Sequence, residues 1–379
     1  MNKICVYAIS KNEEKFVDRW YESMKEADYV VVLDTGSHDN TVKRLKEKGV
    51  IVQQEIIDPW RFDVARNKSL ELVPSDANIL VCTDLDEVLE PGWADILRRE
   101  WKPDIHYRAT YLYSWSHTET GKEGRVFRYD KIHNKDWVWK YPVHECLYNK
   151  ELSTTDYSVF HTLDLTGKIK LHHYPDKSKS RKSYLPLLEL RSDENPDNDI
   201  YGKLYLVHEY YYRGMDSACI QLANKLIRDN KDKFTYLELA NLYLFKGDAY
   251  LRHADLPKGC TFEDNAIECY TEAIWICSTY REPYIALAKI YNKNKEYSAA
   301  IFVLKTCLEC TVRKYSWLER DTSWSYEPYD LLCIASYYGG KKKDAIAFAA
   351  KALSFDPENE RLISNLEQCT LGASDADLF

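Results

Sequence analysis

The first hundred residues alternate short apolar runs with stretches that carry a helical pattern. Apolar runs typical of strands occur at residues 4–9, 29–33, 50–52 and 78–82, and those at 4–9 and 78–82 are typical of buried strands. Phe16, Trp20 and Met24 recur every four residues after the first run, which indicates one apolar helix face. We expect further helices from Thr41 and over residues 62–72. This order predicts a mainly parallel sheet with helices on both faces.

Further along the chain the pattern changes twice. Aromatic and β-branched residues dominate the runs 107–113 and 125–129, which predicts antiparallel strands that extend the sheet. After Pro175 the pattern is helical almost throughout. We therefore expect an α/β domain over residues 1–175 and an all-α domain over residues 176–379.

The second half repeats a helix–turn–helix pattern. Four such units are expected, at residues 205–227, 236–276, 284–308 and 329–353. Each second helix carries a small residue followed by an apolar one, such as Ala266–Ile267, and small residues let paired helices approach closely. The second unit holds an insertion at 252–263, and Asp356 and Pro357 end the last unit. The pattern resembles degenerate tetratricopeptide repeats, and its aromatic stripes are expected to form the repeat core.

Composition separates the broad classes of protein. With 379 residues and 45% apolar content, the chain can bury sizeable cores in two domains or more. The net charge is −8 with both signs interspersed, so a broad footprint for nucleic acid is not evident, although a local basic groove would fit. Apolar runs stay well short of the roughly 20 residues that cross a bilayer, so no membrane partner is expected.

Cysteine usage and the start of the chain bear on location. The eleven cysteines are scattered through predicted strands and helices, which favours reduced thiols in a cytoplasm. Cys307 and Cys310 form one CxxC on a predicted helix and are expected to pack there rather than to bind metal. Met1 leads straight into the first strand, so we expect no secretory signal.

Two carboxylates, Asp84 and Asp86, directly follow the apolar run 78–82. Open α/β sheets bind ligands at the carboxyl ends of their strands. Hard divalent cations prefer oxygen ligands, and a metal held by one or two carboxylates keeps positions for substrate phosphates. The pair therefore indicates a metal–diphosphate site, although a polar turn at a strand end can have the same spacing.

Three further polar segments are expected at the same edge of the sheet. Residues 9–14 follow the first strand, residues 34–37 follow the second, and Arg66 lies near the start of a helix. Arg66 can donate charge-assisted hydrogen bonds to a phosphate there, and Asp34 can accept from a nucleobase or a ribose. Gly36 gives the second loop backbone freedom that a residue with a Cβ lacks.

Taken in order, these motifs resemble the family 2 glycosyltransferases of the GT-A fold. The matching segments are Ile-Ser-Lys-Asn-Glu at 9–13, Val-Leu-Asp-Thr-Gly-Ser at 32–37, Ala-Arg-Asn at 65–67 and Asp-Leu-Asp-Glu at 84–87. The resemblance covers residues 1–175. With the helical repeats attached, the chain resembles the subgroup that includes the sublancin-type peptide S-glycosyltransferases. The resemblance implies a nucleotide-activated sugar, with a UDP-sugar favoured, Mn²⁺ or Mg²⁺ as cofactor, and inversion of the anomeric centre.

The resemblance also assigns residues on the side of the sugar donor. Carried over position by position, Asp34 contacts the base, Arg66 contacts the nucleotide, and Asp84 approaches the ribose or the sugar. The expected donor-binding residues are Ile9, Lys11, Glu13, Asp34, Arg66 and Asp84. Thr35 stands where a second aspartate is commoner in the family, so only Asp34 is carried over from that loop.

Two expected metal ligands come from distant parts of the chain. Asp86 is the second carboxylate of the acidic motif, and residues 170–174 resemble the family's strand that ends in a metal-ligating histidine. His173 is the expected ligand and His172 the alternative, because neighbouring residues of a strand face opposite sides.

An inverting displacement needs a base that takes the acceptor proton from the face opposite the leaving group. Glu145, within a Val-His-Glu segment that resembles the family's own, is the first candidate for this base, and Glu87 is the second. The basic run at 176–182 is expected to be a solvated helix start or, alternatively, a lid over the diphosphate.

These expectations combine into a cytoplasmic, metal-dependent, inverting glycosyltransferase. The repeats would then bind a macromolecular acceptor, with a polypeptide favoured, or form a homodimer contact. A surface glycan, a lipid-linked precursor and a modified DNA base are alternative acceptors, and nucleic acid is not favoured. An inactive transferase domain beside working repeats is the alternative class. The chain departs from the sublancin-type enzymes in lacking their N-terminal helical extension, which weakens any transfer of their acceptor.

Overall fold

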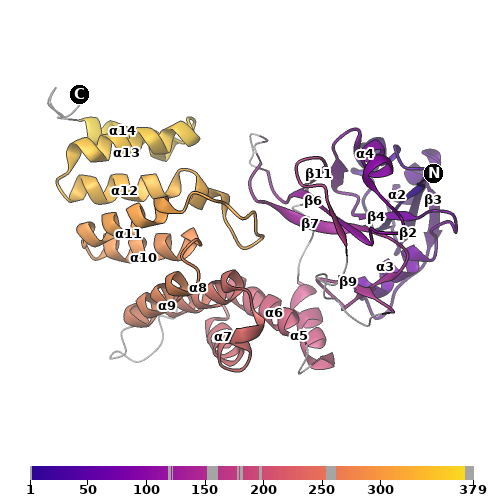
Figure 1. Ribbon diagram of the computed structural model, residues 1–379, viewed down its shortest axis with the longest axis horizontal. Helices are drawn as coiled ribbons and strands as arrows, with labels where there is room; N and C mark the ends of the chain where they lie inside the picture. The colour runs from indigo at the N-terminus through magenta and orange to yellow at the C-terminus, as the bar shows by residue number, and fades with distance from the viewer. Residues whose placement is uncertain are drawn as a thin grey trace. The chain divides into compact units, whose positions relative to one another are not determined.

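The computed structural model describes residues 2–117, 121, 123–151, 161–176, 179, 182–195, 199–252 and 262–371 (Figure 1). The chain forms two compact units, Met1–Pro196 and Asp197–Phe379. The expected domain boundary at residue 175 therefore lies too early. Helix α5 (Tyr184–Glu194) belongs to the first unit, because Arg191 Nη1 donates to the carbonyl oxygens of Val143 and His144, at 3.0 and 2.8 Å.

The first unit is built on a mixed sheet with the strand order β3-β2-β1-β4-β7-β6-β11-β5, and β10 pairs with β6 (Figure 1). The strands are β1 (Ile4–Ser10), β2 (Tyr29–Asp34), β3 (Ile51–Gln54), β4 (Ile79–Thr83), β5 (Glu87–Leu89), β6 (Arg108–Ser114), β7 (Val126–His133), β10 (Thr162–Asp164) and β11 (Lys170–His173). A separate hairpin joins β8 (Trp137–Lys140) to β9 (Cys146–Asn149). Strands β3, β2, β1 and β4 are mutually parallel, and the predicted antiparallel extension begins with β7.

Both faces of the sheet are covered, as the alternation along β1 requires. Ile4, Val6 and Ala8 face one core, and Cys5 and Tyr7 face the other. Helices α1 (Val17–Met24), α2 (Thr41–Glu47) and α4 (Trp93–Glu100) pack on the first face, and α3 (Phe62–Leu70) packs with the β8–β9 hairpin on the second. The predicted arrangement of helices on both faces is therefore confirmed.

The strand directions bring distant loops to one edge. Strands β1, β2 and β4 are parallel, and β6 and β11 have the same direction because β7 is antiparallel to both β4 and β6. The carboxyl ends of these five strands, at Ser10, Asp34, Thr83, Ser114 and His173, therefore lie along the same edge of the sheet. This edge holds the candidate site.

The second unit consists of paired helices, as the repeat pattern predicts (Figure 1). The pairs are α6 (Ile200–Tyr212) with α7 (Asp216–Asn230), α8 (Tyr236–Arg252) with α9 (Phe262–Ile276), α10 (Arg281–Lys293) with α11 (Tyr297–Glu309), and α12 (Glu327–Tyr338) with α13 (Lys342–Phe355). Short 3₁₀ turns lie at Lys231–Lys233 and Asp321–Trp324. Most of the expected insertion at 252–263 lies outside the described residues.

One further helix, α14 (Glu360–Thr370), was not predicted. The chain does leave α13 near Pro357, but the Asn359 side chain then accepts a hydrogen bond from the Leu362 backbone N–H at 3.3 Å. This capping bond starts a new helix, which packs on α13. A proline that ends one helix can therefore be followed closely by a cap that begins the next.

Small residues let the paired helices approach closely, as expected. Cys219, Ala266, Ala300 and Ala345 are fully buried at the predicted positions on the second helices. Gly247 on α8 faces Tyr270 on α9, and a Cβ added at Gly247 would lie 2.6 Å from Tyr270 Cε1. Tyr270, Tyr280 and other aromatic residues of the stripes are buried in the repeat core.

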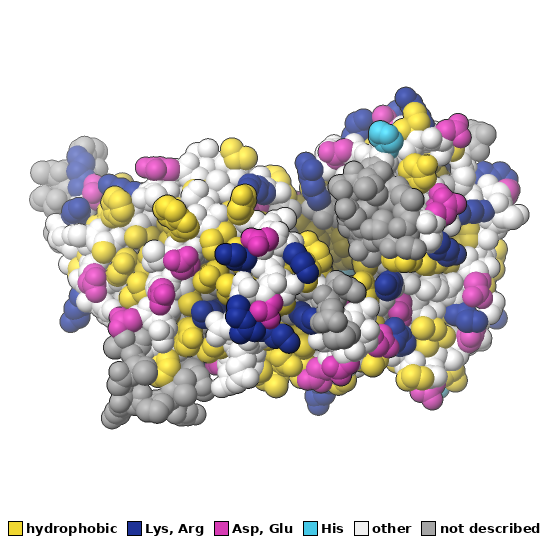
Figure 2. All heavy atoms as spheres, turned by 60° about the horizontal axis from the view of Figure 1, so that its bottom comes forward, with side chains coloured by type: hydrophobic (Ala, Val, Ile, Leu, Met, Phe, Trp, Pro, Cys, Tyr) yellow, Lys and Arg dark blue, Asp and Glu magenta, His cyan; other side chains and the backbone are white. Residues whose placement is uncertain are grey.

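Charges of both signs are mixed on the surface (Figure 2), as the composition predicts, and Cys310 lies just beyond the end of α11 rather than on the helix. Figure 2 shows acidic and basic side chains interspersed over the face it presents. Within the described ranges, every helix is too short or too polar to span a bilayer. The ten described cysteines are free, and Cys307 is buried in the repeat core while Cys310 donates to the Ser278 carbonyl oxygen at 2.9 Å.

We expect Gly247→Ala to destabilise the repeat unit. The added methyl group would overlap Tyr270, and overpacking of this kind costs about 1–3 kcal/mol, more than the helix propensity that alanine gains. Thermal unfolding followed by circular dichroism should show a lower melting temperature. Glu272→Ala, at an exposed position of α9, is the matched control and should change stability by less than about 0.5 kcal/mol. A Gly247→Ala variant that melts at or above the wild-type temperature would contradict the packing argument.

Candidate active site at the carboxyl edge of the sheet

Hydrogen bonds join the loops that follow β1 and β2. The Asn12 backbone N–H donates to Ser37 Oγ at 2.8 Å, and the His38 backbone N–H donates back to Asn12 Oδ1 at 2.8 Å. The Glu13 backbone N–H donates to Thr41 Oγ1 at 2.7 Å. The two loops therefore form one preorganised surface at the edge of the sheet.

Asp34, expected to contact the base, is fully buried and holds its own loop in place. Its Oδ2 accepts from Ser10 Oγ at 2.8 Å and from Ser37 Oγ, and its Oδ1 accepts from the backbone N–H groups of Ser37 and Gly36, at 2.9 and 3.2 Å. Gly36 has φ +106°, a left-handed backbone conformation that favours glycine, as expected for this loop. The carboxylate shapes the turn, and contact with a base stays a prediction.

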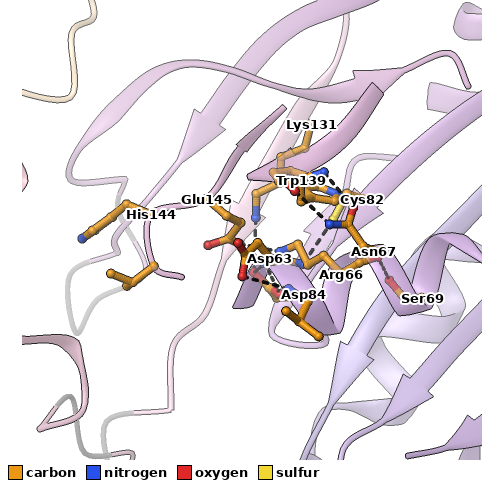
Figure 3. Close-up of polar contacts among 12 residues, drawn as sticks. Asp63, Arg66, Asn67, Ser69, Cys82, Asp84, Lys131, Trp139, His144 and Glu145 are labelled. Atoms are coloured by element: carbon orange, nitrogen blue, oxygen red, sulfur yellow. Dashed lines mark hydrogen bonds and ion pairs between the residues drawn. The ribbon is translucent and has the colours of Figure 1, made fainter. Parts of the chain in front are cut away.

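Arg66 forms the centre of a buried charge cluster (Figure 3). Its side chain is 4% exposed, and its Nη2 donates to Asp84 Oδ1 at 2.9 Å while its Nε donates to Glu145. Figure 3 shows Glu145 and Asp84 directed towards Arg66, whereas His144 lies apart from the cluster. Burial alone would lower the pKa of Arg66, but Asp84 and Glu145 raise that pKa well above its ordinary value. The expected residues Arg66, Asp84 and Glu145 are thus brought together.

Lys131 of β7 completes the cluster and was missed by the sequence analysis. It is 5% exposed, and its Nζ lies 3.2 Å from Asp84 Oδ2 and 3.6 Å from Glu87 Oε1. Burial would lower the pKa of Lys131, but these two carboxylates raise it well above its usual range. The sequence offered one indication of this role. Lys131 alternates with Tyr129 and His133 along the strand, so its side chain lies on the same face as theirs.

The pKa values of the neighbouring carboxylates Asp84 and Glu87 are shifted in opposite directions. Burial favours the neutral form of both, but Arg66 and Lys131 hold the pKa of Asp84 well below its ordinary value. Burial raises the pKa of Glu87, and Lys131 offsets this only in part. Glu87 is 1% exposed; its Oε2 accepts from the Asp84 backbone N–H at 2.9 Å and its Oε1 from the Tyr113 hydroxyl at 2.7 Å. It lies beneath the loop, while the Asp84 side chain is 36% exposed.

The two expected metal ligands lie side by side. Asp86 Oδ2 is 3.4 Å from His173 Nε2, and the two side chains are 19% and 11% exposed. His173 Nδ1 donates to the Trp115 carbonyl oxygen at 2.9 Å, so Nε2 is the ring nitrogen that faces Asp86 and can ligate a metal. Burial lowers the pKa of His173, but Asp86 raises it above its ordinary value. Adjacent ligand atoms around an octahedral cation with bonds of about 2.1 Å lie about 3 Å apart, so the pair fits a single Mn²⁺ or Mg²⁺ ion. The alternative residue, His172, lies on the other side of β11.

The loop after β1 contributes Glu13, whose pKa is affected by the charges of Asp84 and Asp86. Its side chain is 12% exposed and forms an ion pair with Lys179. Burial raises the pKa of Glu13 to about 7, Lys179 opposes the shift, and Asp86 and Asp84 reinforce it. Ile9 is half-buried and Lys11 is exposed at the end of the same strand.

The expected lid is described only in part. Within it, Asp176 pairs with Lys15 at 2.8 Å and Lys179 pairs with Glu13, so these two residues contact the segment after β1. The rest of the basic run, at 177–178 and 180–181, lies outside the described residues. Its role over a diphosphate stays a prediction.

Comparison with known proteins gives likenesses to helical repeat proteins. No family model and no curated protein matches the chain. TTC0263, a thermophilic tetratricopeptide-repeat protein of Thermus thermophilus, is 20% identical, with 49% of this chain and 89% of that chain covered and a TM-score of 0.36. MamA from Desulfovibrio magneticus is 14% identical, with 46% and 85% covered and a TM-score of 0.36. The tetratricopeptide-repeat domain of Arabidopsis OM64 is 16% identical, with 36% and 99% covered and a TM-score of 0.30. The resemblance of the first unit to glycosyltransferases rests on its sequence motifs.

Asp84→Asn should lower stability at neutral pH by about 1–3 kcal/mol, because Arg66 and Lys131 each lose a charged partner that is itself partly solvated. Since the folded-state pKa of Asp84 is lowered, its contribution is fully present above the unfolded-state value of about 3.9, starts to decline below that value, and is lost only as the pH falls through the folded-state pKa. Urea unfolding between pH 7 and pH 3 should show a constant gap between wild type and variant down to about pH 4, and the gap should begin to narrow below that pH.

Asp95→Asn is the matched control for this measurement, because the Asp95 side chain is 85% exposed. It should stay within about 0.5 kcal/mol of wild type at every pH. A gap between Asp84→Asn and wild type that stays constant down to pH 3 would contradict the assigned role of Asp84.

Proposed function

We propose that the protein is a metal-dependent, inverting glycosyltransferase that takes its sugar from a nucleotide diphosphate, with a UDP-sugar favoured. The observation that carries the proposal is the meeting of Asp86 and His173. These residues were expected as ligands of one metal from two separate motifs, and they lie 3.4 Å apart at the carboxyl edge of the sheet. Asp84, Arg66 and Glu145 lie at the same edge.

Asp86 and His173 would hold the Mn²⁺ or Mg²⁺ ion. When bound, the ion supplies Lewis-acid stabilisation for the negative charge that grows on a departing diphosphate. The protein's own contribution is to fix the two ligands beforehand. The Trp115 carbonyl oxygen sets the tautomer of His173, and the Tyr174 backbone N–H donates to the Asp86 carbonyl oxygen at 2.8 Å.

On the donor side, Asp84 is the residue best suited to orient a sugar or ribose hydroxyl. Its carboxylate is held ionised between Arg66 and Lys131, yet a third of its side chain remains exposed. A carboxylate fixed by two buried cations accepts a hydrogen bond without having to reorganise first. Arg66 and Lys131 are therefore positioning residues in this proposal.

For proton transfer, Glu145 is the candidate base. Its side chain is 11% exposed, and Arg66 fixes its orientation through the Nε hydrogen bond. Glu87 is less suited, because it is 1% exposed and both of its oxygens hold neighbouring groups. The acceptor hydroxyl or thiol would approach Glu145 from the face opposite the diphosphate.

The acceptor is proposed from the second unit. Stacked helical repeats build extended surfaces that suit a polypeptide, which remains the favoured acceptor. The net charge of −8 counts against a nucleic acid, because phosphate contacts require a basic surface. A surface glycan or lipid-linked precursor is the next alternative.

The metal pair is tested by measuring hydrolysis of a panel of nucleotide sugars in the presence of Mn²⁺. Asp86→Asn and His173→Ala should each lower turnover at least about 10²-fold, because the charge on the leaving diphosphate loses its stabilisation. Asp95→Asn and His161→Ala, at exposed positions, are the matched controls and should match wild type. Wild-type protein that hydrolyses none of the donors would favour the inactive scaffold instead. An Asp86→Asn variant as active as an active wild type would contradict the role of Asp86 as a metal ligand.

The two candidate bases are separated by matched amide substitutions. Glu145→Gln should keep the affinity for a nucleotide but lower turnover by about 10²–10⁴-fold, because the amide cannot take a proton. Glu87→Gln should act mainly on thermal stability, since the side chain is buried against Lys131 and Tyr113. Nucleotide binding by calorimetry, turnover and melting temperature are measured on both variants. The opposite result, with turnover lost in Glu87→Gln and kept in Glu145→Gln, would reverse the assignment.

A further inference from the structure

A second group of metal-ligating side chains lies on the other side of β11. It consists of His117, Glu123 and His172, whose ligand atoms all lie within 4.8 Å of one another. His117 and Glu123 face each other across an isolated backbone bridge between β6 and β7, and His172 comes from β11. We infer that these three residues form a binding site for a transition-metal ion of the zinc type.

Two of the three distances between the ligand atoms fit a tetrahedral ion. His117 Nε2 lies 3.2 Å from His172 Nδ1, and His172 Nδ1 lies 3.6 Å from Glu123 Oε1. Ligands at about 2.0–2.1 Å from a tetrahedral Zn²⁺ ion are about 3.3 Å apart. Two imidazoles and one carboxylate supply three ligands, and a water molecule can supply the fourth.

Each histidine also has a partner that orients it. His172 Nε2 lies 2.9 Å from Glu90 Oε1, and His117 Nδ1 lies 3.2 Å from the His173 carbonyl oxygen. Metal-ligating histidines regularly donate their second ring N–H to a carboxylate or a carbonyl oxygen in this way. The Tyr174 ring stacks on the His117 ring at 4.6 Å between centroids, which fixes the plane of the imidazole.

The hydrogen bonds cannot all be satisfied by neutral imidazoles. If both rings donate to their oxygen partners, the lone pairs of His117 Nε2 and His172 Nδ1 face each other at 3.2 Å. If either ring turns its proton inward instead, its outer nitrogen presents a lone pair to Glu90 or to the carbonyl oxygen of His173. A positive charge between the two rings, either a proton or a metal ion, removes this conflict.

The rest of the environment allows a cation to bind. Lys170 Nζ lies 3.0 Å from both oxygens of Glu123, but a carboxylate has about four lone-pair sites and can bind a metal as well. Ser114 Oγ lies 3.4 Å from His117 Nε2. The His172 side chain is 17% exposed and that of Glu123 is 35% exposed, so an ion can enter from solvent.

The cluster and the Asp86–His173 pair should select different ions. Imidazole nitrogens favour Zn²⁺ over Mn²⁺ and Mg²⁺, following the general order of affinities for divalent ions. The pair has one carboxylate and one imidazole, with remaining positions that suit phosphate oxygens. A zinc-type ion at the cluster would fasten the segment that carries His117 and Glu123 to β11, beside His173. The inference stands independently of the proposed reaction.

The site is tested in full-length protein that carries Asp86→Asn, so that the Asp86–His173 pair no longer binds metal strongly. After treatment with a chelator, the protein is titrated with Co²⁺, followed by its visible absorption, and then with Zn²⁺ in competition. We expect one ion per chain at the cluster and a higher melting temperature with Zn²⁺. His117→Ala and His172→Ala should each weaken binding at least about 10-fold, and Glu90→Gln should weaken it about 10–100-fold.

His161→Ala is the matched control, because His161 is exposed and outside the cluster. It should leave binding unchanged. Circular dichroism without metal identifies any variant that fails to fold, and Glu90→Gln then still tests the site because it leaves all three ligands in place. Absence of Co²⁺ and Zn²⁺ binding, or binding that His117→Ala, His172→Ala and Glu90→Gln leave unchanged, would overturn the inference. Neither result depends on turnover of a nucleotide sugar.

Discussion

The first unit depends on the neutralisation of two buried cations at the edge of its sheet. The side chains of Arg66 and Lys131 are 4% and 7% exposed, and an unpaired charge at such positions would cost several kcal/mol. Arg66 pairs with Asp84 and Glu145, and Lys131 pairs with Asp84 and Glu87. These groups come from α3, from the turn between β4 and β5, from the start of β5, from β7 and from the segment before β9. The network therefore ties the parallel half of the sheet to its antiparallel extension, and it fixes Asp84 in the same step.

Local patterns in the sequence were sufficient for most of the framework. The alternation along β1 predicted a strand buried on both faces, and Ile4, Val6 and Ala8 do face one core while Cys5 and Tyr7 face the other. The carboxyl-edge loops followed from strand direction, which the order of elements determines. The helix pairs of the second unit followed from the spacing of apolar and small residues. In each case the signal is contained within one or two elements.

Features that depend on contacts between distant segments could not be predicted from such local patterns. Strand alternation required that only one of His172 and His173 face Asp86, but the choice depends on how β11 pairs with β5 and β6. Lys131 is one of many lysines in the sequence, and its partner Asp84 is remote along the chain. Helix α5 was placed in the second unit because it is helical, whereas the Arg191 hydrogen bonds that attach it to the first unit are long-range.

In the proposed reaction, the charges at this edge allow the anionic donor to bind only when a cation is bound there as well. The described groups include three cations, from Arg66, Lys131 and Lys179, and five carboxylates, from Glu13, Asp84, Asp86, Glu87 and Glu145. A nucleotide diphosphate is itself an anion, so this surplus of carboxylates opposes it. A divalent ion at Asp86 and His173 cancels this surplus. It would also favour the ionised form of Glu13, whose pKa burial raises to about 7, because a nearby positive charge lowers the pKa of a carboxyl group. Metal and donor would therefore bind cooperatively, with the metal as the condition for the donor.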